Sequence, residues 1–409
     1  MRCPVILTVL ALAGAAGTAR ADDGKASTWV RLDGFSSSRS LDDEMGDGSI
    51  SLGLKDSYDL GSSDRLRFEG QVRVDQRGDH GDVPITEALW QHSGSWLDLR
   101  IGQQRVAWGK ADGINPTDFF TPHDYTVLQP FEADQRRSIA ALRADAAVAE
   151  GMTLSLVFQP FFVETRLPVV PGVMTTMRDP DGVKQAQVGL RLTSTTDAVD
   201  WSVSVFHGYA KLPLLAYEPG SAALFFHYPM LDAAGADIAH NFGAFGFRAE
   251  AAWLEPHSEN GWSSVRHHGF MVAGVDRGGD DWNVNVQAVA RFTPGVRNEA
   301  PVDPADPQAT LAALVARQNA MNYGQGHTVQ LGFTSRLARS WLQQTLNAEL
   351  LVLGYFQPAT FLVRPMVGYA VTDASRLTVG GEYYVGRDDS FYGQFEKNRT
   401  AFVEYQHFF

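Results

Sequence analysis

The sequence predicts an all-β fold, a transmembrane antiparallel β-barrel of about eighteen strands. Apolar and polar residues alternate along most of the chain, which is typical of strands with one apolar face. The chain is 44% hydrophobic, with twenty-four Phe, twelve Tyr and nine Trp, yet no segment after the N-terminus has the length and apolarity of a transmembrane helix. The last ten residues, Thr400 to Phe409, alternate and stop on an aromatic residue. This ending predicts that the last strand is part of the structure, since most chains end in a frayed polar tail.

The N-terminus has the three parts of a secretory signal peptide. Arg2 supplies a positive charge, residues 5–16 are apolar, and Ala19-Arg20-Ala21 forms an A-x-A cleavage site. The apolar run is shorter than the roughly 20 residues that a membrane-spanning helix needs. We therefore expect residues 1–21 to be a cleaved signal peptide and residues 22–409 to be one outer-membrane barrel domain. The only cysteine, Cys3, lies within the signal, so the mature chain is expected to contain no disulfide.

Residues 65–75 illustrate the alternation. Leu66, Phe68, Val72 and Val74 fall on one face, and the charged and amide side chains fall on the other. A soluble β-sandwich shows the same pattern, so its repetition along the chain is the stronger evidence for a barrel. The pattern recurs in residues 185–192, 282–292, 329–336 and 376–385.

Short polar turns separate many of the predicted strands, and the connections between them are often longer. Outer-membrane barrels have short periplasmic turns and long external loops, so eight turns and nine loops predict about eighteen strands, an even number that permits closure. Residues 223–239 are interpreted as one strand and residues 245–253 as the next. If this interpretation fails, about sixteen strands is the fallback. The predicted turns are residues 61–64, 93–95, 149–151, 195–197, 241–243, 277–280, 338–340 and 372–374.

The tryptophans lie near the predicted strand ends, which favours an aromatic girdle at the membrane interfaces. The alternative is that they pack inside a soluble sandwich. The nine positions are Trp29, Trp90, Trp96, Trp108, Trp201, Trp253, Trp262, Trp282 and Trp341.

The most distinctive non-repetitive segment is residues 109–135. Two prolines exclude a regular strand over much of it, and it is longer and more charged than a turn. We expect it to fold inward and narrow the pore, with its charges set against basic side chains across the opening. The alternative is a solvated external loop. The predicted constriction residues are Arg105, Lys110, Asp112, Asp118, Asp124, Arg136 and Arg137.

The strand before this loop changes phase. Leu97, Leu99 and Ile101 face lipid in one phase, whereas Val106 and Trp108 need the other. An extra residue near position 103, a β-bulge, would correct the phase and turn Arg105 inward.

Other charged side chains fall on the predicted inner face of the strands. They mix both signs and are expected to line the lumen: Arg67, Glu69, Arg73, Arg143, Arg191, Arg248, Glu250 and Arg291. The loop of residues 294–326 contains a predicted helix from Asp306, a good N-cap, with Pro307 at the first helical position. This helix lies over the external mouth, dips into the lumen or packs on the rim; the sequence does not decide among these placements.

No pattern of catalytic residues is apparent. H-x-x-x-H, G-x-S-x-G and C-x-x-C are absent, and the adjacent pair His267-His268 points to opposite faces of a strand. We expect no enzymatic activity, no metal site and no cofactor. The formal charge of −13 argues against a nucleic-acid partner.

Arg100-Ile101-Gly102-Gln103-Gln104-Arg105-Val106-Ala107-Trp108-Gly109-Lys110, followed by Gly113-Ile114-Asn115-Pro116-Thr117-Asp118, resembles a family of poorly characterised proteobacterial outer-membrane barrel proteins. These carry a strand ending in Gly-x-Gln…Trp-Gly and then an Ile-Asn-Pro-x-Asp loop. The chain is more distantly similar to the alginate-export porins. The resemblance implies a channel or exporter component, but the mixed charges predicted for the lumen differ from the arginine-rich lining of the alginate-type pore.

The function expected from these features is a porin-like channel of the Gram-negative outer membrane for passive passage of small hydrophilic solutes. The alternative is the outer-membrane component of a transport or export system for a hydrophobic or polymeric substrate. The expected partners are outer-membrane lipid, lipopolysaccharide and, through the strand ending at Phe409, the barrel-assembly machinery. Whether the protein forms a homo-oligomer is left open.

Overall fold

The structure is a computed structural model. It describes residues 26–37, 46–75, 81–126, 131–167, 175–178, 185–196, 199–218, 223–257, 265–296 and 305–409. The expected signal peptide, residues 1–21, lies outside these ranges.

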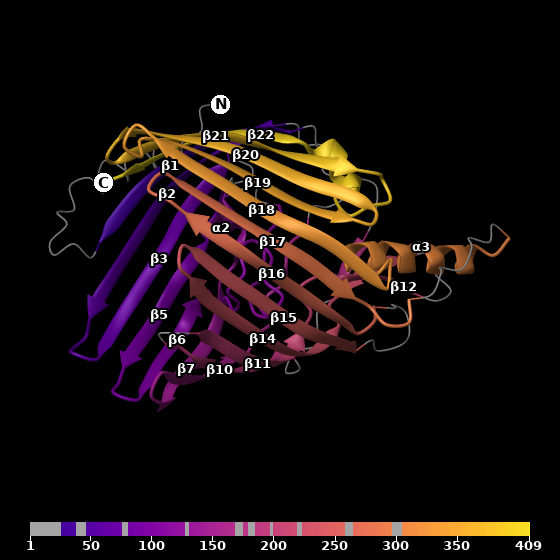
Figure 1. The fold of residues 1–409 in the computed structure, drawn as a ribbon, viewed down its shortest axis with the longest axis horizontal. Coiled ribbons are helices and arrows are strands. Elements are labelled where there is room, and N and C mark those ends of the chain that lie inside the picture. Colours follow the sequence, from indigo (N-terminus) through magenta and orange to yellow (C-terminus); the bar gives the residue numbers. More distant parts are fainter. Residues whose placement is uncertain are drawn as a thin grey trace.

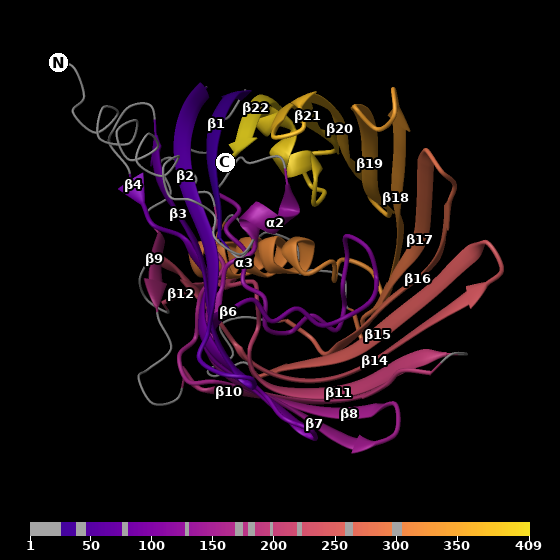
Figure 2. The same ribbon diagram turned by 90° about the vertical axis from the view of Figure 1, so that its left-hand side faces the viewer.

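Eighteen antiparallel strands close into a barrel, as predicted (Figure 2). β1 pairs with β2 on one side and with β22 on the other, which closes the sheet. The two-residue strand β4 (Gly81–Asp82) pairs only with β3 and adds no wall strand. In order around the barrel, the wall strands are β1 (Ser27–Ser37), β2 (Gly46–Asp59), β3 (Asp64–Asp75), β5 (Ile85–Ser93), β6 (Leu97–Gln104), β7 (Ile139–Ala149), β8 (Met152–Gln159), β10 (Gln187–Ser194), β11 (Asp200–Tyr209), β14 (Met230–Phe242), β15 (Phe245–His257), β16 (His268–Gly278), β17 (Trp282–Phe292), β18 (Val329–Trp341), β19 (Leu346–Phe356), β20 (Ala359–Thr372), β21 (Ser375–Gly386) and β22 (Thr400–Phe408).

The outer face of the wall is apolar and the inner face is polar. On β3, Leu66, Phe68 and Val72 are 43%, 40% and 45% exposed on the outside, whereas Arg67 and Glu69 form ion pairs on the inside. A closed sheet bonds every strand on both edges, which the membrane interior requires because it offers no water to unpaired backbone groups. The alternation in the sequence therefore corresponds to an apolar outer face and a polar inner face, as predicted for a barrel.

One end of the barrel carries short connections at all eight predicted turn positions, with shifts of a few residues. The turn predicted at residues 338–340 lies at 342–345, after β18, for example. At the opposite end, residues 223–239 do not form one strand, as had been predicted. β13 (Leu224–His227) ends before Pro229, which has no N–H to donate to a ladder, and β14 begins at Met230. The count of eighteen is unaffected because β13 pairs with β9 (Thr175–Arg178) and β12 (Leu214–Tyr217) in a separate small sheet.

The predicted helix is α3 (Pro307–Asn322), and Asp306 caps it by accepting from the backbone N–H groups of Gln308 and Ala309. Asn319 of α3 exchanges two hydrogen bonds with the backbone of Leu215 in β12, at 2.8 and 2.9 Å. The helix therefore packs on the small sheet at the loop end, beyond the ends of the wall strands (Figure 1). The short helices α2 (Glu132–Gln135) and η3 (Gly393–Asn398) belong to two other connections at this end. Among the described residues, no helix has the length and apolarity needed to cross a membrane.

The girdle prediction holds for only some tryptophans. Trp253, Trp282 and Trp341 are 40–42% exposed on the outer face, but Trp29 and Trp108 are not part of a girdle. Trp29 shares the inner face of β1 with Arg31, and its ring covers Gly53 of β2 and lies 6.5 Å from the ring of Phe408. Trp108 is buried inside the barrel, and Trp262 lies outside the described residues.

Candidate functional site

The chain leaves the barrel wall after Gln104 and returns to it at Ile139. The connection between β6 and β7 enters the interior of the barrel (Figure 2), and we call its described parts, residues 105–126 and 131–138, the inward loop. The predicted bulge near Gln103 is absent, since β6 pairs with both neighbours without a register shift. Val106 and Trp108 are buried instead of facing lipid because they no longer belong to the wall.

An aromatic cluster attaches the first half of the inward loop to the wall. Trp108 packs edge-on against Phe120, with ring centroids 5.1 Å apart, and Phe120 packs edge-on against Phe206 of β11 at 5.0 Å. Gly189 of β10 lies beneath these rings, and a Cβ atom there would come within 2.6 Å of the Trp108 ring. The wall therefore has a glycine at the position where the rings need room.

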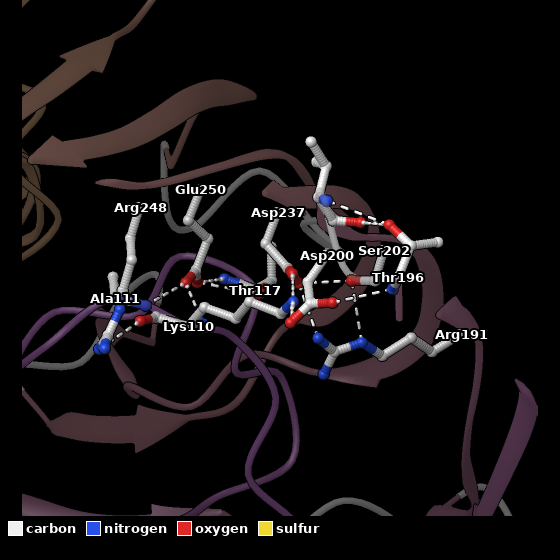
Figure 3. Close-up of polar contacts among 11 residues, drawn as sticks. Lys110, Ala111, Thr117, Arg191, Thr196, Asp200, Ser202, Asp237, Arg248 and Glu250 are labelled. Atoms are coloured by element: carbon white, nitrogen blue, oxygen red, sulfur yellow. Dashed lines mark hydrogen bonds and ion pairs between the residues drawn. The ribbon is translucent and has the colours of Figure 1, made fainter. Parts of the chain in front are cut away.

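The carboxylate of Glu250, on β15, bonds the backbone of the same loop (Figure 3). It accepts from the N–H groups of Lys110 at 3.0 Å, Ala111 at 3.1 Å and Thr117 at 2.6 Å, and from the Thr117 hydroxyl at 2.9 Å. Such a buried charge is stable only when it is hydrogen-bonded. Gly109 has a φ of +102°, and a Cβ there would lie 2.6 Å from a Glu250 oxygen, so only glycine fits this approach. Glu250, which was predicted to line the lumen, lies on the inner face of β15 and is the polar anchor of the loop there.

A charged network lies beside this anchor (Figure 3). The Lys110 ammonium is 3.8 Å from Asp200 and 3.9 Å from Asp237. Asp237 pairs with Arg191 at 2.7 Å, and the Arg191 guanidinium lies 5.9 Å from the centroid of the Trp108 ring. The network places the Lys110 side chain against β11 and β14 rather than across an open pore.

Further along the barrel, the loop contacts the opposite part of the wall. Asp112 lies 3.7 Å from Arg336 of β18, which also pairs with Glu349 at 2.7 Å. Ala111 and Ile114 pack on a buried cluster of Val272, Val289 and Tyr355. The first half of the loop is thus attached to the inner wall from β7 to β19.

Asp118 and Asp124 find partners in other connections at the loop end. Asp118 lies 3.7 Å from Lys211 and accepts from the Thr121 hydroxyl at 2.9 Å. Asp124 pairs with Arg166 at 3.2 Å. Lys211 and Arg166 were not among the predicted partners, which were Arg105, Arg136 and Arg137, but Asp124 lies around one cavity with these three arginines.

The second half of the loop crosses to β1. Asp134 pairs with Arg31 at 3.0 Å, and Arg31 also lies 3.5 Å from Glu404 of β22. Within this half, Arg136 pairs with Glu132 at 2.8 Å. No motif in the sequence singles out Arg31 or Asp134, because the alternation in β1 places Arg31 on the inner face but carries no information about its partner.

A cavity of about 720 Å³ lies between the inward loop and the wall formed by β1, β2, β3, β5 and β6. Its lining includes seven cationic and four acidic side chains, a formal excess of three positive charges. Four of the predicted constriction residues are among them. The charged residues of the lining are Arg31, Lys55, Arg73, Arg105, Arg136, Arg137, Arg166, Glu69, Asp82, Asp124 and Asp134.

The seven predicted constriction residues therefore divide into two groups. Arg105, Asp124, Arg136 and Arg137 surround the cavity, whereas Lys110, Asp112 and Asp118 lie elsewhere along the loop with partners of their own. Burial lowers the pKa of the Arg105 guanidinium, but a group with so high an ordinary pKa stays charged at neutral pH.

The remaining predicted lumen residues lie on the inner face, most with a partner of opposite charge. The pairs are Arg67 with Glu87 at 3.0 Å, Glu69 with Lys55 at 2.9 Å, Arg73 with Asp82 at 2.7 Å, Arg143 with Asp145 at 2.8 Å, Arg191 with Asp237 at 2.7 Å and Arg248 with Asp276 at 3.6 Å. Arg291 instead lies over the rings of Phe270 and Tyr355. Within the described residues, no group of three or more His, Cys, Asp or Glu side chains is arranged to hold a metal ion.

Solved bacterial outer-membrane proteins have a similar fold. The chain is similar to the outer-membrane protein OpdK of Pseudomonas aeruginosa, with a TM-score of 0.56 and 8% identity over 94% of this chain and 98% of that one. OpdK has also been solved with vanillate, at 9% identity and the same TM-score and coverage. OccAB1 of Acinetobacter baumannii aligns with a TM-score of 0.57 and 7% identity over 94% of this chain and 96% of that one. No protein-family model matches the chain, and no curated protein matches it.

Replacement of the loop anchor tests the docking of the inward loop. In Glu250→Gln the amide nitrogen cannot accept, so at least one backbone N–H loses its partner, at a cost of about 1–3 kcal/mol. We expect single-channel recordings in planar bilayers to show larger and noisier open states than the wild type. The matched control is Glu382→Gln on β21, where the carboxylate pairs with Arg364 of the wall. Equal noise in both variants would contradict the assignment.

Acid is expected to loosen the same loop through His123. Burial, and then the nearby Lys211 charge, lower the pKa of this imidazole to about 4, from an ordinary value of about 6.5. Docking of the loop thus holds His123 neutral, and the free energy that favours docking has its full value above pH 6.5. This free energy falls by about 3 kcal/mol as the pH drops to 4, because the undocked loop binds the proton more tightly. Current fluctuations should increase between pH 6 and 4, and His123→Gln should reduce that increase; an unchanged pH profile would contradict the prediction.

Proposed function

We propose that the protein is a channel of the Gram-negative outer membrane through which small hydrophilic solutes, preferentially small organic anions, diffuse. The observation that carries the proposal is the cavity beside the inward loop, where cationic side chains exceed acidic ones by three. Solutes would pass between the loop and the wall of β1 to β6, because the rest of the loop is attached to the inner wall from β7 to β19.

Several observations support this function. The outer face of the barrel is apolar and the inner face charged, as expected for a passage through lipid. Paired charges hydrate a lumen without binding a solute too tightly to release it. The presence of vanillate, a carboxylate, in a structure of OpdK supports an anionic solute for a cavity of this charge.

The proposal includes the expected recognition by the assembly machinery. β22 pairs with β1 along nine residue pairs, and the N–H of Phe409 donates to the carbonyl of Thr28 at 2.9 Å. The strand that the machinery would read is also the strand that closes the barrel.

Reversal potentials in salt gradients test the charge preference. We expect the wild type in a planar bilayer to prefer chloride over potassium. Arg105→Gln and Arg136→Gln should shift the reversal potential toward the cation value because both lose positive charge from the cavity. Asp112→Asn serves as the control, since this carboxylate lies away from the cavity beside Arg336, and should change it little.

Two outcomes would contradict the proposal. A cation preference in the wild type, or a shift in Asp112→Asn equal to that in the arginine variants, would remove the role of the cavity. Absence of conductance would instead favour the alternative, an export component for a hydrophobic or polymeric substrate, such as the polyuronate of the alginate-export porins, with its pore closed at rest.

A further inference from the structure

Two arginines lie on the outer face at the end of the barrel that carries the short turns. Arg277 is one residue before the end of β16, and Arg339 is two residues before the end of β18. Each shares its face of the strand with an exposed apolar residue two positions away, Val275 at 47% and Leu337 at 42%. We propose that the two guanidiniums bind the phosphate of an anionic glycerophospholipid. The inference rests on the membrane location proposed above.

Aromatic rings of the outer face position both guanidiniums. The Arg277 guanidinium carbon lies 4.9 Å from the ring centroid of Phe245 and 5.8 Å from that of Trp282. The Arg339 guanidinium carbon lies 5.3 Å from the centroid of the Trp341 ring. A ring attracts the cation but accepts hydrogen bonds only weakly. The N–H groups of both side chains therefore still need strong acceptors, which phosphate oxygens supply.

Neither guanidinium has a carboxylate partner. Across the described ranges of the chain, no acidic side chain comes within 4 Å of the guanidinium nitrogens of Arg277 or Arg339. Asp276 points to the inner face, where it forms an ion pair, and Asp280 and Asp281 belong to the exposed turn beyond the strand ends. Because a guanidinium stays charged throughout the physiological pH range, an anion meets two cations here without any change of protonation.

Both side chains stand at the level of the lipid headgroups. Trp282 is the first residue of β17 and Trp341 is the last residue of β18, and such aromatic residues mark the interface between bilayer and water. A cation on the lipid face is costly at the bilayer midplane and nearly neutral at the interface. In outer-membrane barrels the short turns face the periplasm, so this end of the wall meets the inner leaflet, which consists of glycerophospholipids.

The two cations flank a single strand. Trp282 of β17 is paired with Arg339 of β18, and Val284, two positions further along the same face of β17, is paired with Arg277 of β16. Neighbouring strands are about 4.8 Å apart, so the two arginines leave the sheet roughly 10 Å apart across it. Two long side chains at this separation can approach one phosphate from opposite sides.

The wall beside these cations offers an apolar surface to the acyl chains. Val275, Val286 and Leu337 lie nearer the bilayer centre on the same three strands and are 42–47% exposed. Most of the outer face has this apolar character, so the acyl chains alone should not distinguish this place from others. The phosphate therefore supplies the selectivity.

The test uses the full barrel in detergent and measures lipid binding by native mass spectrometry. We expect dimyristoyl phosphatidylglycerol to bind at least about tenfold tighter than dimyristoylglycerol, a ratio equivalent to one charge-assisted hydrogen bond. The double variant Arg277→Gln/Arg339→Gln should lose this preference. Arg277→Lys/Arg339→Lys should keep most of it, because the charge remains. The matched control is Arg376→Gln on β21, since Arg376 is at the same end of the barrel but is paired with Gln406, which lines the cavity inside.

Four results would overturn the inference: equal binding of the two lipids to the wild type, a preference that survives in the glutamine double variant, an equal loss in Arg376→Gln, or displacement of the phosphatidylglycerol by millimolar inorganic phosphate, which would indicate a site for free anions. Channel measurements keep the two proposals apart. Arg277 and Arg339 face outward, so their variants should conduct as the wild type does, and a wild-type barrel that does not conduct would contradict the channel but not the lipid site.

Discussion

In a membrane, backbone N–H and C=O groups must find hydrogen-bond partners within the protein. The pairing of every strand in this barrel meets this requirement. The pairing of β1 with β22 meets that requirement for the first and last strands and turns an open sheet into a closed wall. With eighteen strands the wall encloses more space than its own side chains fill. The character of the interior is therefore decided by what the chain places there, and here that is the inward loop.

Apolar and polar contacts together hold the inward loop on one side of the barrel, and the two kinds contribute differently. Trp108 and Phe120 supply buried apolar area, while Glu250 orients the backbone through hydrogen bonds from three N–H groups and accepts a fourth from the Thr117 hydroxyl. The wall accommodates the loop by means of glycines: a Cβ at Gly189 would strike Trp108, and one at Gly235 would come within 2.6 Å of Thr117. Small wall residues beneath the loop thus determine which side it occupies, and the space on the other side becomes the cavity.

The strands could be predicted from the sequence because alternation and turn composition are local properties. The error at residues 223–239 arose at Pro229, where two strands of different sheets follow each other along the chain. Contacts between distant segments were not predictable in the same way. Asp112 meets Arg336 and Asp134 meets Arg31, and no spacing in the sequence indicates either pair. Trp29 was predicted to belong to a girdle because it lies near a strand end. Trp29 and Leu32, however, lie on opposite faces of β1, and Leu32 faces outward, so the alternation already placed Trp29 inside.

The charge of the chain and the charge of the passage have opposite signs, and the positions of the partners explain this. The chain carries a formal charge of −13, yet the cavity carries an excess of three cations. Asp112 and Asp118 are paired with cations away from the cavity, while Arg105, Arg136 and Arg137 remain in its lining. In the proposed channel, an ion responds to charges within about 8 Å in physiological salt, so it would be influenced by the cations and the fewer acids of the lining rather than by acids on the distant loops. The proposed channel can therefore belong to an acidic chain and still favour anions, because the cations that line its passage outnumber the acids that line it.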